Sequence, residues 1–437
     1  VTTWIGTPGA TWFWSGLVWL CASALVLGLA FPWERKEETQ DRARARCLRN
    51  MARDPFLFFA VAGLLFLVVQ AVNGGRELVY DAGSDCWAFG APVWPWAPSH
   101  IVTGNAWRAV AACCAFLCVC LAVRHTMGRR ARLLLFHGMS LNAALLALWT
   151  LVRLALQHGL AVSGLPGFLF YRPGAAGGAH YVLMTAVAAG LALDAADRGR
   201  FTPWLVLPPV LNFLGVLMMG DAAAVLAVWV FAGAARIYGI LYVWPRMSAG
   251  KILRLLFWGV VPLLCFGIYY FRFHAGNPLR QPGVWTRHGE GAAAAAWRLW
   301  SDHFWTGAGA GGFAPLAPLY GWVKAVGPDG GAGSDFVLYL CEHGVAGCGL
   351  IALALGTVIL GYLRRLALLP QVPAAKPAPG RCWFFRMTPL AVLLSLSLFL
   401  VCVLGAAGRV FHTVTVALPW GILLVGMGSF LPVRRRV

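Results

Sequence analysis

The chain has 437 residues, of which 60% are hydrophobic and only 12% are charged. Soluble globular chains carry about twice that share of charged residues, so a water-soluble fold is excluded and lipid is the expected solvent. The formal net charge is +19, but the arginines cluster between apolar runs, where they interact with anionic headgroups of membrane lipid, so no nucleic-acid partner is expected.

Long apolar runs recur along the whole chain. A bilayer core of about 30 Å needs roughly 20 apolar residues per helix, and on that measure the sequence predicts about eleven transmembrane helices. The expected spans are 12–31, 56–73, 107–123, 133–156, 180–195, 203–219, 222–242, 254–271, 344–363, 388–405 and 413–431. Pro208 and Pro209 are expected to bend the sixth span. We therefore predict an all-α polytopic membrane protein with a single transmembrane domain, residues 1–437.

Lysines and arginines concentrate in alternate connections between these runs. The basic connections are 34–54, 124–132, 195–202, 243–254, 364–386 and the tail at 434–436. Cytoplasmic loops carry an excess of lysine and arginine, so these connections are expected on the cytoplasmic side. The first run has no positive segment before it, which favours a span over a cleavable signal. The N-terminus is therefore expected outside and the C-terminus in the cytoplasm.

Three connections on the opposite side are long enough to be structured. They are 74–106, 158–179 and 272–335, the last forming a large loop between the eighth and ninth spans. The first is rich in Trp and Pro, which suits a cap at headgroup level. Within the largest, alanines from Ala292 are followed by Trp297, Trp300 and Trp305, a pattern that predicts a helix on the outer surface of the bundle.

Cysteines and glycines give no cofactor or metal signature. Most of the twelve cysteines lie inside apolar runs, so packing is favoured over a disulfide or metal site. The glycine-rich segment Gly307–Gly312 follows a Trp-rich helical segment rather than a strand and lacks the Lys-Ser/Thr ending of a phosphate-binding loop. A turn that reverses the chain is the favoured interpretation.

Ionisable residues gather at the outer ends of the expected spans. They are Arg172, Asp221, Arg272, Arg280, Arg287, Asp302, His303, Asp335, Glu342, His343 and Arg409. Such groups are costly at membrane depth, so they pair or serve function, and each one singly is more often a solvated or paired residue at a span end. Together they predict an outward-facing polar cavity whose arginines suit bidentate binding of phosphate or diphosphate.

Two stretches resemble the O-antigen ligase and O-antigen polymerase superfamily. Residues 300–313 read WSDHFWTGAGAGGF and residues 334–347 read SDFVLYLCEHGVAG. They are similar to the family segments W-x-D-H-P-x-x-G-x-G and H-N-D-x-L-x-x-L-x-E-x-G-x-x-G, and the closest match covers 287–347. The resemblance implies a membrane glycosyltransferase fold of the C type in the bacterial inner membrane. It also implies transfer of glycan from a polyprenyl diphosphate donor to an acceptor, without a metal.

The resemblance also implies roles for particular residues. Arginines would hold the diphosphate, and a positioned base would act near the acceptor hydroxyl. The candidate substrate-binding residues are Arg287, Arg280, Arg172 and Arg409, and the candidate catalytic residues are Glu342, Asp335 and His343. Two positions depart from the family pattern: Gly333 stands where the family has His, and Asp221 stands where many members have Arg.

Three functions remain open from the sequence. The first is glycan transfer at the periplasmic face by an O-antigen ligase-like protein, a candidate glycosyltransferase. The second is an inactive homologue that serves as a structural or assembly subunit beside other membrane subunits of a larger complex. The third, a transporter, is the least favoured, because it needs broken helices with paired ionisable groups near the midplane, which these spans hardly offer.

Overall fold

The computed structural model describes residues 11–33, 38–74, 78–81, 86–89, 92–159, 175–200, 202–238, 290–321, 333–367 and 387–431. The helices are α2 (Thr11–Ala30), α3 (Gln40–Ala52), α4 (Pro55–Val72), α5 (Thr103–Leu121), α6 (Arg129–Gly159), α7 (Ala175–Asp197), α8 (Leu207–Met218), α9 (Ala222–Tyr238), α11 (Glu290–Asp302), α12 (Phe313–Leu316), α13 (Asp335–Ala367), α14 (Pro389–Ala407) and α15 (Val414–Gly426). A π-helical turn, η1 (Ala122–Thr126), follows α5. Two short strands, β1 (Leu78–Asp81) and β2 (Cys86–Phe89), pair antiparallel.

Seven described helices are long and apolar enough to cross a membrane. They are α2, α4, α5 with its π turn, α6, α7, α13 and α14. The prediction of a helical membrane protein is therefore confirmed, whereas the count of eleven spans is not. The runs at 203–219, 222–242 and 413–431 form shorter apolar helices in the structure, and the run at 254–271 lies outside the described residues.

The proline pair of the sixth run does not bend a span. Pro208 and Pro209 lie in the first turn of α8, after a short 3-10 segment at 203–206. Proline is tolerated there because the first backbone N–H groups of a helix have no intrahelical partner. The expected bend is therefore wrong, and the prolines begin a helix instead.

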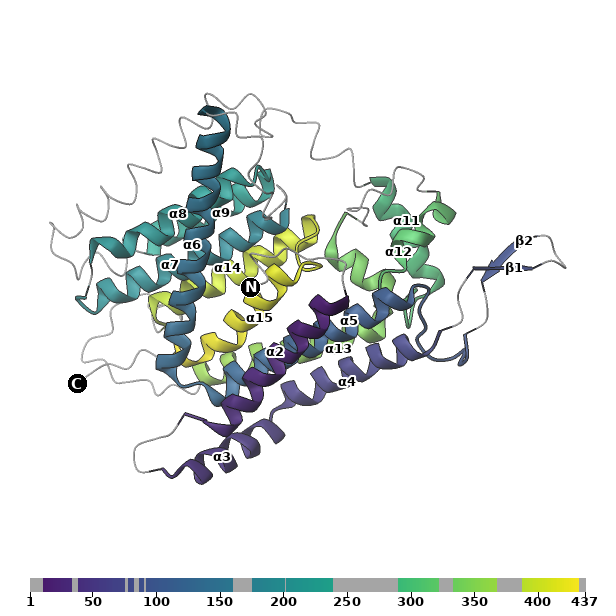
Figure 1. Ribbon diagram of the computed structural model, residues 1–437, viewed down its shortest axis with the longest axis horizontal. Helices are drawn as coiled ribbons and strands as arrows, with labels where there is room; N and C mark the ends of the chain where they lie inside the picture. Colours follow the sequence, from purple (N-terminus) through teal and green to yellow (C-terminus); the bar gives the residue numbers. More distant parts are fainter. Residues whose placement is uncertain are drawn as a thin grey trace.

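Among the described residues, many arginines gather at one end of the bundle. One end carries α3, the start of α4 and the end of α13, and we call it the basic end (lower left in Figure 1). Its arginines include Arg42, Arg44, Arg46, Arg49, Arg53, Arg124, Arg129, Arg130, Arg132, Arg364 and Arg365. The opposite end carries α11, α12 and the strand pair (right in Figure 1), and we call it the loop end.

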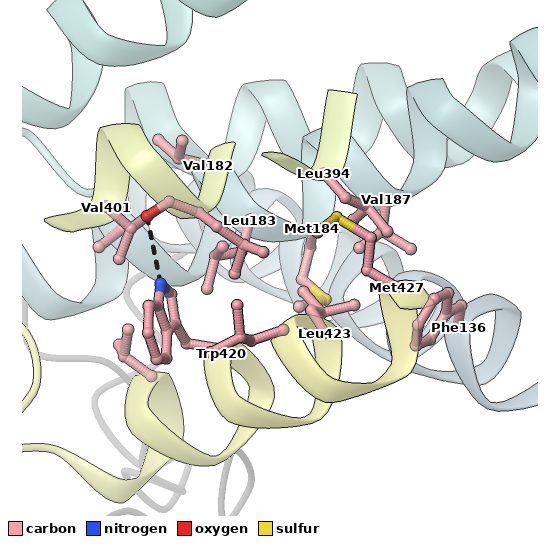
Figure 2. Packing of buried hydrophobic residues seen from close by; sticks show 14 of the residues in the cluster. Phe136, Val182, Leu183, Met184, Val187, Leu394, Val401, Trp420, Leu423 and Met427 are labelled. Carbon is pink, nitrogen blue, oxygen red and sulfur yellow. Dashed lines mark hydrogen bonds between the residues drawn. The ribbon is translucent and has the colours of Figure 1, made fainter. Parts of the chain in front are cut away.

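A tightly packed core joins α7, α14 and α15. Figure 2 shows Val182, Leu183, Met184 and Val187 of α7 facing side chains of α14, α15 and the segment after it. Trp420 in α15 donates its indole N–H to the Leu398 carbonyl at 3.2 Å. Gly190 lies against Leu390, and Gly215 lies against the Tyr181 ring. Small residues at these contacts let the helices approach closely, which is how membrane helices pack without a hydrophobic driving force between them.

Helices α4 and α13 pack antiparallel and set the level of the loop end. Gly63 lies opposite Leu350, and the Gln70 side chain donates to the Glu342 carbonyl at 3.2 Å. The 18 residues of α4 extend about 27 Å at 1.5 Å per residue, close to the thickness of a bilayer core. The 33 residues of α13 are longer than that core requires, so its first turns continue past the end of α4.

Candidate functional site

Helix α13 is broken at Gly344, and a loop packs into the break. Gly344 has φ +62° and ψ −171°, a region that essentially only glycine adopts. The segment 304–309 lies beside this residue and exchanges backbone hydrogen bonds with α13 on both sides of it. After the break, the Val345 N–H donates to the Phe304 carbonyl at 3.0 Å, and the Ala346 N–H donates to the Trp305 carbonyl at 3.1 Å. Before the break, the Cys341 carbonyl accepts the Ala308 N–H at 2.8 Å, and the Glu342 carbonyl accepts the Gly309 N–H at 2.9 Å. The stretches 300–313 and 334–347 therefore form one structural unit.

The glycines of the loop are required by close backbone contacts. A Cβ on Gly307 would overlap the Glu342 carbonyl, and a Cβ on Gly309 would lie 2.7 Å from the Ser99 carbonyl oxygen. Both glycines, together with Gly311, have positive φ, which disfavours any other residue. The segment 307–312 reverses the chain between α11 and α12, as the sequence predicts, and it does so against α13.

The carboxylate of Glu342 lies inside this loop. The backbone N–H groups of Gly311 and Phe313 donate to it, and the Arg409 guanidinium interacts with it electrostatically. Successive N–H groups around positive-φ glycines form a concavity that binds anions. Here the anion is the protein's own buried carboxylate, so Glu342 holds the glycine loop closed on α13.

A line of buried polar groups continues from His343. Its Nδ1 lies 3.3 Å from the Gln70 Oε1, and its ring stacks on Tyr339. The Gln70 carbonyl lies 2.8 Å from His100 Nδ1, and His100 Nε2 lies 3.0 Å from the Thr103 hydroxyl. If Nδ1 of His100 carries the proton, it donates to the carbonyl while Nε2 accepts from Thr103. His343 is therefore one member of a hydrogen-bonded chain that reaches α4 and α5.

Asp335 anchors the connection between α14 and α15. Its Oδ2 accepts the backbone N–H groups of Val410 and Phe411, the latter at 2.5 Å. Its own backbone N–H donates to the Gly408 carbonyl at 3.1 Å. Asp335 is completely buried, and its other oxygen, Oδ1, has no hydrogen-bond partner among the described residues and lies 3.7 Å from His412 Nδ1. Asp335 therefore fixes the short segment that carries Arg409.

Four of the predicted site residues lie together. Glu342 and His343 are adjacent in α13, and Asp335 begins the same helix. Arg409 interacts electrostatically with both Glu342 and Tyr339. The structure therefore brings these four residues together at the start of α13 and the connection between α14 and α15. Arg172, Arg272, Arg280 and Arg287 lie outside the described residues, so the expected arginine-lined cavity is described only at Arg409.

The remaining ionisable candidates have local structural roles. Asp221 caps α9, with its Oδ2 accepting the Ala224 N–H at 3.1 Å. Burial raises the pKa of the Asp221 carboxyl, and the N–H groups of Ala224 and Ala223 oppose that rise. Asp302 accepts the Tyr320 hydroxyl at 2.7 Å on the surface, and His303 follows it in the turn after α11.

The sequence did not single out Gln70, His100 or Thr103 as site residues. Gln70 interrupts the apolar run 56–73, and a lone amide in such a run is a signal for a buried polar contact. His100 and Thr103 lie at the end of a Trp-rich connection, where no spacing points to α4 or α13. Their contacts become visible only in the folded chain.

The basic end contains a separate ion-pair cluster. The Asp54 carboxylate accepts hydrogen bonds from Arg124, from His125 at 3.0 Å and from the Phe56 N–H at 3.1 Å. Burial alone would raise the pKa of the Asp54 carboxyl, but these hydrogen bonds lower it to about 2. Asp54 also caps α4, so this cluster ties α4 to the π turn after α5.

Comparison with known proteins adds no relative. No protein-family model matches the chain, and no curated protein matches it. In the ranges that the structure describes, no group of three or more His, Cys, Asp or Glu side chains is placed to hold a metal ion.

Proposed function

We propose that this chain is an O-antigen ligase-like membrane protein that transfers glycan from a polyprenyl diphosphate donor. The proposed location is a bacterial inner membrane, with the basic end of the bundle in the cytoplasm and the loop end in the periplasm. The observation that carries the proposal is the union of 300–313 and 334–347 at the break in α13. These stretches carry the family resemblance, and they meet on the end of the bundle opposite to α3.

Arg409 is the described residue best suited to the donor. A guanidinium binds diphosphate oxygens in a bidentate manner and keeps its charge. Asp335 holds the backbone next to Arg409, and the Glu342 carboxylate lies close enough to interact with the guanidinium. In this proposal Arg172, Arg280 and Arg287 contribute further charge from the same side of the membrane. Asp335 and Glu342 are positioning residues, because both carboxylates accept backbone N–H groups.

A second function, a structural or assembly subunit with the same fold, is favoured by a different observation. The carboxylates of Asp335 and Glu342 both accept backbone N–H groups and so hold backbone segments together. Gly333 and Asp221 stand where the family has His and Arg. In this alternative the chain retains the rigid loop unit without the transfer reaction and binds other membrane subunits.

The two functions are separated by an assay on the full chain. Wild type, Arg409→Ala and Arg287→Ala are reconstituted in vesicles with a polyprenyl diphosphate-linked glycan and an acceptor glycolipid that carries free hydroxyl groups. Release of polyprenyl diphosphate and formation of the glycosylated acceptor are both measured. We expect Arg409→Ala to lose on the order of 10²-fold in rate, as when one charge-stabilising donor is removed. Arg298→Ala is the matched control, because Arg298 is an exposed arginine at the same end.

Each outcome points to one function. Full activity of Arg409→Ala contradicts the proposed donor role. Absence of turnover in the wild type, together with stable co-purification of other membrane proteins, supports the structural subunit and contradicts glycan transfer.

A further inference from the structure

Helix α11 has three faces of different chemistry. Its buried face packs against α13 and consists of Ala292, Ala295, Ala296 and Leu299. A second face carries Arg298, Ser301 and Asp302, which are exposed. The third face carries Trp297 and Trp300 and continues to Phe304, and we call these three residues the aromatic stripe. At 100° per residue the stripe lies about 120° from the polar face.

Among the described residues, the aromatic stripe is a continuous surface that is exposed at Trp297 and Phe304 and partly buried at Trp300, which packs against the buried cluster under α11. Ring centroids are 4.6 Å apart between Trp297 and Trp300, and 4.9 Å apart between Trp300 and Phe304. Trp305 extends the stripe, with its ring centroid 5.1 Å from that of Phe304. Trp297 is 56% exposed, Phe304 40% and Trp305 68%. A contiguous exposed aromatic surface of this kind marks an interaction site.

The level of the stripe relative to the spans follows from backbone contacts. The carbonyls of Phe304 and Trp305 accept N–H groups of α13 directly after its break. The break itself lies beside the last turn of α4, because Gln70 donates to the Glu342 carbonyl. Since the length of α4 matches a bilayer core, its last turn marks the boundary between hydrocarbon and headgroups. Phe304 and Trp305 are therefore level with that boundary.

A second segment places tryptophans at the same level independently. The Trp94 N–H donates to the Asn73 Oδ1 at 2.9 Å, and the Asn73 side chain donates to the Trp94 carbonyl at 3.0 Å. Asn73 directly follows α4. Trp96, two residues on, is 83% exposed. Exposed Trp from two separate segments at one level is the pattern of an interfacial aromatic belt, in which amphipathic rings sit among headgroups.

We propose that the aromatic stripe inserts into the headgroup layer of the leaflet at the loop end and takes a phospholipid surface as its partner. The polar face with Arg298 and Asp302 then remains in water. Because the carbonyls of Phe304 and Trp305 are bonded to α13, this contact also holds the glycine loop over Glu342. The membrane surface thus stabilises the unit formed by residues 300–313 and 334–347, whether or not the protein transfers glycan.

Photocrosslinking of the full chain in vesicles tests the contact. The photoreactive residue p-benzoylphenylalanine replaces Trp297, Phe304 or, as matched control, the exposed Arg298 on the polar face. The vesicles contain radiolabelled phosphatidylethanolamine and phosphatidylglycerol. We expect several-fold more lipid adduct from positions 297 and 304 than from 298, which lies about 100° from 297 on the helix. Equal adducts at all three positions, or adducts only to a second copy of the chain or another protein, would overturn the proposal.

Hydrogen exchange tests the coupling to the loop. In vesicles, the doubly substituted chain Trp297→Ser/Phe304→Ser is expected to exchange the Ala308 and Gly309 amide protons several-fold faster than wild type. Trp204→Ser is the control, because Trp204 is also highly exposed but precedes α8 at the other end. Unchanged exchange at both amides in the doubly substituted chain would show that the stripe does not stabilise the loop.

Discussion

Because α13 is broken at Gly344, we predict that Gly344→Ala strongly destabilises the folded chain. At φ +62° and ψ −171° an alanine adopts a region reserved almost entirely for glycine, at a cost of about 1–3 kcal/mol. Its Cβ would also overlap the Trp305 carbonyl and lie 2.6 Å from the Gly307 nitrogen, which adds about 1–3 kcal/mol of overpacking. The expected loss of folding free energy is therefore about 2–6 kcal/mol.

The matched control for this substitution lies in the same helix. Gly356 is exposed, and a Cβ added there would meet nothing within 4 Å. Alanine is favoured over glycine in a helix interior by roughly 0.5–1 kcal/mol, so Gly356→Ala should be neutral or slightly stabilising.

Both variants can be compared in detergent by thermal unfolding, followed through tryptophan fluorescence, and by exchange of the Ala308 and Gly309 amides. Gly344→Ala should lower the apparent melting temperature and expose both amides. If it melts with the wild type and protects both amides equally, the assignment of Gly344 as the point of loop attachment is wrong.

Three further predictions concern carboxylates. Asp335→Ala leaves the Val410 and Phe411 N–H groups without their acceptor, which should lower the free energy of unfolding by about 1–3 kcal/mol for each group. Asp302→Ala, a control on the surface, should change it by less than about 0.5 kcal/mol. Thermal unfolding of both variants checks this. Asp221→Ala removes the cap of α9 and should cost about 1 kcal/mol; an unchanged melting temperature would argue against the cap. Because the pKa of Asp54 is lowered from 3.8 to about 2 in the folded chain, its stabilisation is complete above pH 4 and is lost as the pH falls towards 2. In Asp54→Asn the melting temperature should therefore change less with pH between pH 4 and pH 2 than it does in the wild type.

The membrane class and the charged end could be predicted because they depend on composition along the chain. Helix lengths could not, since hydropathy counts apolar residues whether or not they are helical. The run at 203–219 begins with a 3-10 segment and two prolines, and the run at 413–431 ends near a second 3-10 segment, at 427–429. Each contributes a shorter helix than its apolar length predicts.

The candidate site, like the fold, could be predicted from the sequence only in part. The grouping of Asp335, Glu342, His343 and Arg409 follows from motif and hydropathy, because all lie at span ends on one side. Their roles do not follow, because the groups that engage the two carboxylates are backbone N–H groups from other segments. Asp335 accepts from a residue 75 positions away. Backbone partners at such separations leave no mark in residue types, so a carboxylate that holds a loop resembles one that performs chemistry.

The bond from Gln70 to the Glu342 carbonyl joins residues 272 positions apart, which has a consequence for biogenesis. At synthesis rates of about 5–20 residues per second, roughly 15–50 seconds pass between the emergence of these two residues from the ribosome. During that interval α4 is already made and its amide has no native partner. Until α13 is made, water or an insertion factor at the membrane boundary must therefore hydrogen-bond the Gln70 side chain in place of the Glu342 carbonyl.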